Sequence, residues 1–364
     1  MNKIEFLNPN YSTTRLCYKL VDNKFLDENG KIKEEYKFKL NFPEFGIIDS
    51  KIPAKKDEKF DTFLFLPEGE GRKGEGGLRT KGYFKFSYEK VGSDWYVVDS
   101  NSEKISKLEL PTTHYPLITI ITVVYNGEKY LEETIQSVIN QTYPNVEYII
   151  IDGGSTDGTL DIIRKYEDYI DYWVSEKDRG ISDAFNKGVI AAKGCYINFQ
   201  GDGDGFVLPD SLEKVIINIE PNKDVLISAR IQRIDIEGKE LFTSKHVESF
   251  DKKSLLFRMS LPHQGLFTHK NYFKKYGLFD VNNFFCMDYE LLLRSYHEFP
   301  KVVTKNIVVA RWRNDGLGND RILEIYKEYD KIKRDNKVSS SFVLNCIKYW
   351  TLFKYYVKKI IERK

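Results

Sequence analysis

Two aspartates, Asp202 and Asp204, stand one residue apart in the stretch INFQGDGDGF (197–206), directly after an apolar run. Carboxylate oxygens are the ligands that hard cations such as Mg²⁺ take from proteins, so the pair is a candidate metal site at a strand end. Asp and Gly are also the usual residues of tight turns, so the stretch alone favours a turn without chemistry. The surrounding sequence has to separate these two interpretations.

Three more polar clusters follow apolar runs in the same manner: YNGE (125–128), DGGSTDGT (152–159) and SEKDRG (175–180). The runs alternate with segments of helical periodicity, which predicts a mainly parallel α/β sheet flanked by helices. Ligands bind at the carboxyl ends of the strands in such sheets. We therefore expect one edge to gather Asp152, Glu176, Asp178, Asp202 and Asp204. Clustered carboxylates repel one another, and a divalent cation that bridges a diphosphate offsets their charge.

The chain divides by composition into three parts. Residues 1–112 show short alternating segments broken by Pro and Gly, which predicts a small β-rich accessory region. Residues 116–325 carry the strand–helix alternation, and residues 326–364 form a basic tail of helical periodicity. A glycine-rich stretch, EGEGRKGEGGLRTKG (68–82), lacks the GK[ST] ending of a P-loop. We expect a mobile connector there, and the alternative is a phosphate contact through Arg72, Arg79 or Lys81.

Composition narrows the class of protein. The net charge is +2 and acids and bases are interspersed, which argues against a nucleic-acid partner. The cysteines (Cys17, Cys195, Cys286 and Cys346) lie far apart with no CxxC pair, which argues against a zinc ribbon or disulfide framework and favours a reducing cytoplasm. No run approaches the roughly 20 apolar residues of a spanning helix. We expect a cytoplasmic protein, with the option of attachment to a membrane surface.

The order of the motifs resembles a known family. ITVVYNGEKYLEETIQSVINQTYPNVEYIIIDGGSTDGT, then SEKDRGISDAFNKGV, then a strand ending in D-x-D, is similar to family 2 glycosyltransferases of the GT-A (Rossmann-like) fold. The similarity continues through LPHQGLFTHKNYFKKYGLFD and CMDYELLLR, so it spans roughly residues 116–315. The subgroup it resembles builds bacterial O-antigen, capsule and other surface glycans.

The resemblance implies a nucleotide-sugar donor, most simply a UDP-sugar. Asp152 would accept the N3–H of uracil, Tyr125 would pack on the base, and Glu128 would lie near the nucleoside. The other donor-binding residues that it implies are Asn126, Asp178, Asp183, Lys187 and Asp202.

The resemblance also implies a reaction. Asp204, with Asp202 as its partner, would hold Mn²⁺ or Mg²⁺, and Asp288 would be the general base that takes the acceptor's proton. One sugar would be transferred with inversion in a single displacement. The sequence departs from the subgroup at one point, because Gly201 and Gly203 stand where relatives often carry polar residues. The role of Asp202 is therefore less firmly implied than that of Asp204.

Two further pairs are candidates for acceptor or diphosphate contacts. His263 and Gln264 form a polar pair in an otherwise apolar stretch, LPHQG, which favours a functional role over a structural one. Arg311 and Arg313, in ARWRNDGLG, are expected to reach phosphate from a flexible loop, and surface charges are the equal alternative.

The tail VLNCIKYWTLFKYYVKKIIERK (343–364) places apolar residues at near-helical spacing among lysines. Trp and Tyr beside a lysine-rich face are typical of a helix that lies on a membrane, while a helix packed on the catalytic domain is the alternative. A glycan or polyprenyl-diphosphate-linked acceptor would suit the first interpretation. For the whole chain, the alternative to an enzyme is a catalytically inactive nucleotide- or glycan-binding module; the joint presence of Asp152, Asp204 and Asp288 favours the enzyme.

Overall fold

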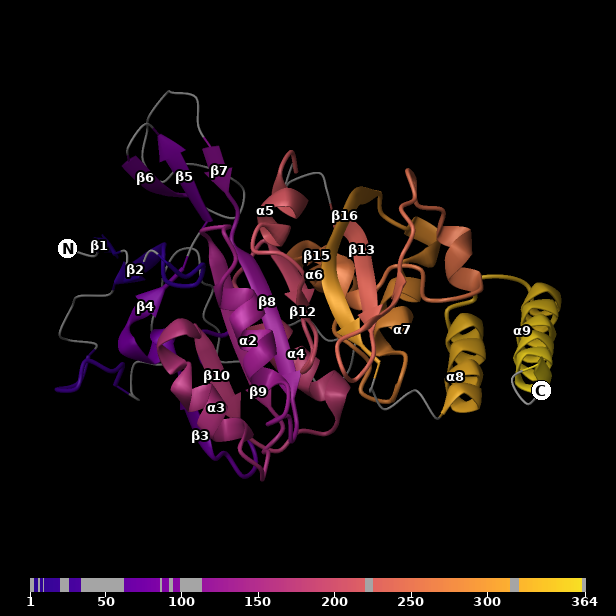
Figure 1. Cartoon of the computed structure of the whole chain (residues 1–364), viewed down its shortest axis with the longest axis horizontal. Helices are drawn as coiled ribbons and strands as arrows, with labels where there is room; N and C mark the ends of the chain where they lie inside the picture. Colours follow the sequence, from indigo (N-terminus) through magenta and orange to yellow (C-terminus); the bar gives the residue numbers. More distant parts are fainter. Residues whose placement is uncertain are drawn as a thin grey trace.

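A mixed ten-stranded sheet runs through the molecule (Figure 1). The computed structural model describes residues 3–5, 7–8, 10–19, 26–33, 62–85, 87–91, 94–98, 113–219, 225–314 and 321–361. The strand order is β12-β16-β13-β15-β11-β8-β9-β10-β3, and β14 pairs with β13 outside this path. The expected α/β sheet flanked by helices is confirmed.

The centre of the sheet is parallel. Its four strands are β8 (Ile118–Val124), β9 (Val146–Asp152), β10 (Tyr172–Ser175) and β11 (Tyr196–Phe199). They run in the order β11-β8-β9-β10, each parallel to its neighbour. Every residue of these strands is buried, as expected when helices cover both faces of a sheet. The carboxyl ends of all four strands therefore meet at one edge.

The remaining strands extend the sheet on both sides. On the β11 side, β15 (Leu266–His269) pairs antiparallel with β11 and with β13 (Leu226–Ile234). Beyond β13 lie β16 (Val302–Arg313), which is parallel to β13, and then β12 (Gly205–Phe206). β14 (Glu240–Thr243) pairs with the end of β13, on the side where β15 pairs with its start. On the other side, β3 (Gly74–Gly76) closes the sheet antiparallel to β10.

Two hydrophobic cores lie on the two faces of the sheet. Alternate residues of β9 enter different cores, Ile149 and Ile151 on one side and Tyr148 and Ile150 on the other. The second core includes α2 (Leu131–Ile139), α3 (Thr159–Lys165) and α5 (Ser211–Ile216). The first includes α4 (Ile181–Ala191), α6 (Lys270–Tyr276) and α7 (Met287–Arg294). Short 3₁₀ helices are η1 (Leu78–Lys81), η2 (Glu167–Tyr169), η3 (Lys252–Leu256), η4 (His263–Gly265) and η5 (Tyr296–Glu298).

Within the described residues, the N-terminal region contains short strands, as expected. Besides β3 they build two small sheets: β1 (Lys3–Glu5) with β2 (Cys17–Lys19) and β4 (Tyr83–Phe84), and β5 (Ser87–Val91) with β6 (Asp94–Val98) and with β7 (Thr113–Tyr115), which follows residue 112. Residues 62–85 do not stand apart from the α/β part, because β3 pairs with β10 and Phe63–Leu66 enter the first core. A division at residue 112 thus separates residues 62–85 from the sheet that they join.

The glycine-rich stretch is packed rather than mobile, which corrects our expectation of a connector. A methyl group added at Gly74 or Gly76 would lie 2.9 or 2.5 Å from the ring of Trp173, so only glycine lets β3 pair over that ring. A methyl group at Gly69 would lie 2.3 Å from a carboxylate oxygen of Glu176. The glycines therefore serve close approach to β10.

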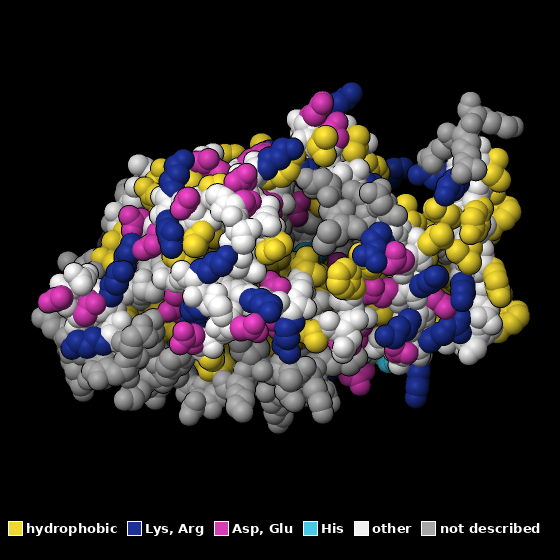
Figure 2. All heavy atoms as spheres, turned by 90° about the horizontal axis from the view of Figure 1, so that it is seen from below, with side chains coloured by type: hydrophobic (Ala, Val, Ile, Leu, Met, Phe, Trp, Pro, Cys, Tyr) yellow, Lys and Arg dark blue, Asp and Glu magenta, His cyan; other side chains and the backbone are white. Residues whose placement is uncertain are grey.

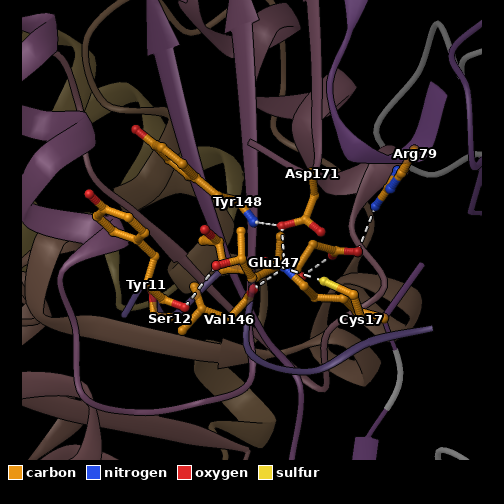
Figure 3. Close-up of polar contacts among 12 residues, drawn as sticks. Tyr11, Ser12, Cys17, Arg79, Val146, Glu147, Tyr148 and Asp171 are labelled. Carbon is orange, nitrogen blue, oxygen red and sulfur yellow. Dashed lines mark hydrogen bonds and ion pairs between the residues drawn. The ribbon is translucent and has the colours of Figure 1, made fainter. Parts of the chain in front are cut away.

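Two buried ion pairs join residues 79–85 to the amino-terminal ends of β9 and β10. Figure 3 shows Arg79, Glu147 and Asp171 at this place. Arg79 Nη2 lies 2.6 Å from Glu147 Oε1, and Lys85 Nζ lies 2.7 Å from Asp171 Oδ2. Burial alone would raise the pKa of Glu147, but the charge of Arg79 and two hydrogen bonds hold it below its ordinary value. The phosphate contact considered for Arg79 and Lys81 is wrong, since Arg79 is buried here and Lys81 pairs with Glu167 and Asp168.

Two helices, α8 (Ile322–Asp335) and α9 (Ser341–Ile361), form the end of the molecule opposite the N-terminus (Figure 1). The expected helical tail is confirmed, but residue 326 lies inside α8, so the tail begins no later than Ile322. α9 packs through Leu344 and Ile347 and leaves much of its apolar surface exposed. Within the described ranges, no helix combines the length and apolarity needed to cross a membrane.

Candidate functional site

Three of the predicted donor-binding residues follow β8. Tyr125 is 65% exposed, so its ring is available to a ligand. Asn126 adopts a left-handed conformation (φ 54°), and its Oδ1 accepts a hydrogen bond from Thr156 N at 2.9 Å. Glu128 Oε2 accepts one from Gly158 N at 2.7 Å. Asn126 and Glu128 thus join the loops after β8 and β9, and Tyr125 is the member of the group that is free to stack.

Asp152, the last residue of β9, is completely buried. Its carboxylate accepts hydrogen bonds from Ser155 N (3.1 Å), from the Ser155 hydroxyl, and from the Ser175 hydroxyl at the end of β10 (2.5 Å). Gly153 lies between Tyr125 and Asp178, since a methyl group there would be 3.4 and 2.5 Å from their side chains.

The segment after β10 holds the other predicted donor residues. Asp178 is partly buried, and burial raises the pKa of its carboxyl although the Gly180 N–H opposes the shift. Asp183 is buried at the start of α4 and accepts an ion pair from Arg179 at 2.6 Å. Lys187 pairs with the buried Glu176 at 2.7 Å. Asp183 and Lys187 are therefore engaged by protein partners, and Asp178 lies nearest to Tyr125 and Asp152.

Asp202 and Asp204 follow β11, on the same edge. Asp204 is 6% exposed; its Oδ1 accepts from Arg313 N at 3.1 Å and its Oδ2 from Gln264 Nε2 at 2.8 Å. Asp202 points toward the loop after β8, where a methyl group on Gly127 would lie 2.5 Å from Oδ2. Burial raises the pKa of Tyr148, and the nearby Asp202 carboxylate adds to the shift.

A third group of residues comes from outside the parallel strands. In η4, His263 stacks on Phe199 with ring centroids 4.7 Å apart, and its Nδ1 lies 4.0 Å from Asp288 Oδ2 at the start of α7. Burial raises the pKa of Asp288 to about 6, and the Tyr289 N–H, which donates to Oδ1 at 2.7 Å, opposes the shift. Burial lowers the pKa of His263 to about 4. At neutral pH the pair is therefore a carboxylate beside a neutral imidazole.

Consecutive residues of η4 thus connect two aspartates: His263 faces Asp288, and Gln264 binds Asp204. The amides of Asn198 and Gln200, on β11 and just after it, hold this turn by donating to the Gln264 carbonyl at 3.0 Å each. A partly buried carboxylate with a raised pKa is suited to accept a proton near neutral pH. The site therefore combines an exposed aromatic ring that can stack on a nucleobase, Tyr125, with a carboxylate that can accept a proton, Asp288.

Comparison with known proteins identifies the family of this chain. The family described as glycosyl transferase family 2 matches residues 119–295. The chain is 31% identical over 228 residues to an uncharacterized glycosyltransferase of Rickettsia typhi, covering 60% of this chain and 71% of that protein. This chain belongs to glycosyl transferase family 2.

Other relatives of this family 2 transferase carry more specific names. It is 27% identical over 244 residues to a PGL/p-HBAD biosynthesis glycosyltransferase of Mycobacterium tuberculosis, covering 65% of this chain and 91% of that one. Among solved structures, S. aureus TarS 1–349 in complex with UDP superposes with a TM-score of 0.51 at 15% identity, covering 66% of this chain and 72% of that chain. The latter likeness confirms the GT-A fold.

The arginines of this transferase lie differently from our expectation. Arg311 and Arg313 belong to strand β16 and not to a flexible loop. Both pair with Glu133, and the Arg313 guanidinium also lies 4.3 Å from the Tyr130 ring centroid. Arg313 is 5% exposed and supports Asp204 through its backbone. Arg311 stays more accessible, with 28% of its side chain exposed.

A metal ion at the proposed site would have few protein ligands among the described residues. Among the described residues, no group of three or more His, Cys, Asp or Glu side chains is placed to hold a metal ion. Asp202 and Asp204 supply at most two carboxylates, each oxygen of Asp204 already accepting one hydrogen bond from a neutral donor. This donor set fits a cation that takes its other ligands from a diphosphate and water, as Mg²⁺ commonly does.

Several residues of the site escaped the sequence analysis. Ser155 and Ser175 orient Asp152, and Asn198 and Gln200 orient Gln264. All four lie at or just beyond strand ends, and that position is the signal that would have found them. Lys73, whose ammonium binds the carbonyls of Gly154 and Ser155 at 2.9 and 2.8 Å, carried no such signal, because its partners are about 80 residues away in sequence.

Proposed function

We propose that this family 2 transferase moves a single hexosyl or N-acetylhexosaminyl unit, with inversion, from a UDP-sugar to a glycan or lipid-linked acceptor of a bacterial surface polysaccharide. One observation carries the proposal: His263 and Gln264 link a proton acceptor, Asp288, to the candidate diphosphate-side residue Asp204. The UDP in the TarS structure supports a uridine donor. The relative named for PGL/p-HBAD biosynthesis supports a lipid or glycan acceptor.

The donor would lie along the edge of the parallel strands. Tyr125 packs on the base, Asp152 accepts its N3–H, and Asp178 lies beside the nucleoside. Asn126, Glu128, Asp183 and Lys187 act through the loops and helix that they hold. Arg311 would approach the diphosphate or acceptor from β16, exchanging Glu133 for it.

Asp288 would perform the proton transfer. Its Oδ1 is fixed by Tyr289 N, which leaves Oδ2 on the side of His263 to take the acceptor's hydroxyl proton. The acceptor oxygen forms a bond to the anomeric carbon as the bond from that carbon to the diphosphate breaks, and the electron pair leaves with the nucleoside diphosphate. Asp204 with Asp202 would hold Mn²⁺ or Mg²⁺, which supplies charge neutralisation for the leaving group. Neutral His263 orients the carboxylate or the hydroxyl.

Nucleotide calorimetry tests this proposal. We expect UDP to bind the parent in the presence of Mn²⁺, with binding lost in EDTA and in Asp204→Ala. GDP and dTDP serve as competitors for the donor class. Asp210→Ala is the matched control. Asp210 is a surface aspartate that pairs with Lys214 and, like Asp204, follows β11 in the sequence. Absence of binding by every nucleotide, from folded parent protein, would favour the inactive-module alternative.

We further propose that α9 lies on the cytoplasmic surface of an anionic membrane, next to a lipid-linked acceptor. Figure 2 shows hydrophobic side chains gathered at the end of the molecule that carries α9. Phe342, Tyr349, Trp350, Phe353, Ile360 and Ile361 are each more than half exposed there. Residues 341–361 contain four lysines and no acid, so two copies of this face would repel each other, whereas anionic lipid attracts it.

Vesicle sedimentation tests the membrane proposal. The parent should pellet with phosphatidylcholine vesicles that contain phosphatidylglycerol and not with phosphatidylcholine alone. Trp350→Ser with Phe353→Ser should reduce pelleting at least about tenfold, because two large side chains no longer enter the interface. Leu241→Ser with Phe242→Ser is the control, since both side chains are equally exposed on β14. Self-association that the α9 variant abolishes, without vesicle binding by the parent, would assign the face to a second copy instead.

A further inference from the structure

Residues 66–76 form a strap that crosses the carboxyl ends of β9 and β10. Strand β3 attaches the strap to β10 through the registers Trp173↔Gly76 and Ser175↔Gly74. Further backbone hydrogen bonds run from Lys73 N to Ser175 O (2.7 Å) and from Lys177 N to Glu70 O (3.1 Å). The strap therefore follows the chain past the end of β10, into the segment that leads to Asp178.

The first contact that holds the strap in place is an ion pair. Arg72 lies 2.7 Å from Glu176, which directly follows β10 and is 1% exposed. The same carboxylate accepts from Gly69 N at 3.0 Å and pairs with Lys187 of α4. Arg72 also donates to the carbonyls of Leu66 and Pro67 at 3.2 and 2.6 Å, which closes the strap on itself. Glu176 is thereby held between the strap and α4.

The second contact is made by Lys73, whose side chain reaches the loop after β9. Its Nζ donates to Gly154 O at 2.9 Å and to Ser155 O at 2.8 Å. Ser155 is the residue whose N–H and hydroxyl bind the Asp152 carboxylate. The ammonium therefore restrains the backbone that both covers Asp152 and supplies its hydrogen-bond donors.

We propose that Lys73 is a positioning residue of the nucleotide site: by gripping the carbonyls of Gly154 and Ser155, it holds the loop after β9 in the arrangement that orients Asp152 for the donor. Charge-assisted hydrogen bonds to carbonyls fix a loop without entering the site. The inference rests on the proposed nucleotide-donor function. It assigns part of the donor site to the N-terminal region, which the sequence analysis treated as accessory.

Lys73→Met tests the proposal on the full chain, with UDP and Mn²⁺ as the probe. We expect UDP to bind three- to tenfold more weakly, because two partly exposed hydrogen bonds are lost. Hydrogen exchange at residues 153–157 should become faster. Lys73→Arg should restore both, since a guanidinium can donate to the same carbonyls. The temperature of unfolding should stay at the parent value.

Lys81→Met is the matched control, because Lys81 lies just beyond the strap and pairs with Glu167 and Asp168, away from the loop. Unchanged UDP affinity in Lys73→Met, from a parent that binds UDP, would overturn the inference. So would an equal loss in Lys73→Met and Lys81→Met, which would indicate general destabilisation. A parent that binds no nucleotide would instead contradict the proposed function, and faster loop exchange in Lys73→Met would then still report the grip of Lys73.

Discussion

Strand β9 carries a buried carboxylate near each end, and the two are stabilised in different ways. At the amino end, Glu147 meets the Arg79 guanidinium, the Thr119 hydroxyl and the Lys193 N–H. At the carboxyl end, Asp152 meets only neutral donors of Ser155 and Ser175 among the contacts described. Both residues are at most 1% exposed, so burial does not distinguish them.

Two other carboxylates proposed to act chemically resemble Asp152, whereas Glu176 and Asp183 near the same edge have ionic partners. Asp204 is also held by neutral donors, Gln264 Nε2 and Arg313 N, and Asp288 by Tyr289 N. An ion pair in the interior cancels charge, while neutral hydrogen bonds keep a carboxylate ionised and still able to bind a cation or a proton. In β9, charge is thus matched at the amino-terminal end and retained at the end that we propose binds the donor.

The largest expected effect is at Asp288. Asp288→Asn should lower transfer by roughly 10²–10⁴-fold, because the proton acceptor is lost while Asn can still accept from Tyr289 N. UDP affinity and the free energy of unfolding should change little, and both are measured on the same preparation. Transfer at the parent rate would show that another group takes the proton.

At the amino-terminal end of β9, where Glu147 pairs with Arg79, we expect a substitution to change stability and not UDP affinity. Arg79→Met should lower the free energy of unfolding by about 3–5 kcal/mol, because it leaves the buried Glu147 carboxylate without its cation. Adding Glu147→Met should recover part of the loss in denaturant unfolding. UDP affinity of the protein that remains folded should equal that of the parent. A selective loss of UDP affinity in Arg79→Met would break the contrast between the two ends.

Much of the parallel half of the molecule was predictable from local pattern. Four β-branched or aromatic runs gave the central strands, and the acidic residues that follow them lie at one edge, as parallel strands require. Asp204 was a candidate from its position after a strand, and the resemblance supported it, while Asp288 came from the resemblance alone. Their connection through η4 depends on tertiary packing that no local period encodes.

The strap shows where local pattern fails. Glycines at 69, 74 and 76 suggested flexibility, although each is required by the approach of Glu176 or Trp173 from about 100 residues away. The arginines of ARWR were expected in a flexible loop, but they belong to strand β16. Pairings between distant segments determine both regions, and a single sequence does not display them.

Asp152→Asn probes the open end of β9 directly. UDP affinity should fall by about 10- to 100-fold, the equivalent of one hydrogen bond to a charged group, since the amide is a weaker acceptor for the N3–H of a base. The free energy of unfolding should fall by only about 1 kcal/mol, because Ser155 and Ser175 keep an acceptor in place. Calorimetry and denaturant unfolding give the two numbers. A stability loss as large as that of Arg79→Met would make Asp152 a structural residue like Glu147.

The pH dependence of transfer tests the retained charge of Asp288. Burial raises the pKa of Asp288 to about 6, so the base is ionised above that pH and protonated below it. The rate should therefore fall as pH decreases through about 6, approaching tenfold per unit, with roughly a tenfold loss at pH 5 relative to pH 7.5. The residual rate of Asp288→Asn should lack this inflection, while its UDP binding over the same range controls for loss of donor. An inflection that persists in Asp288→Asn would assign the titration to a different group of the edge, such as Asp178, whose pKa burial also raises.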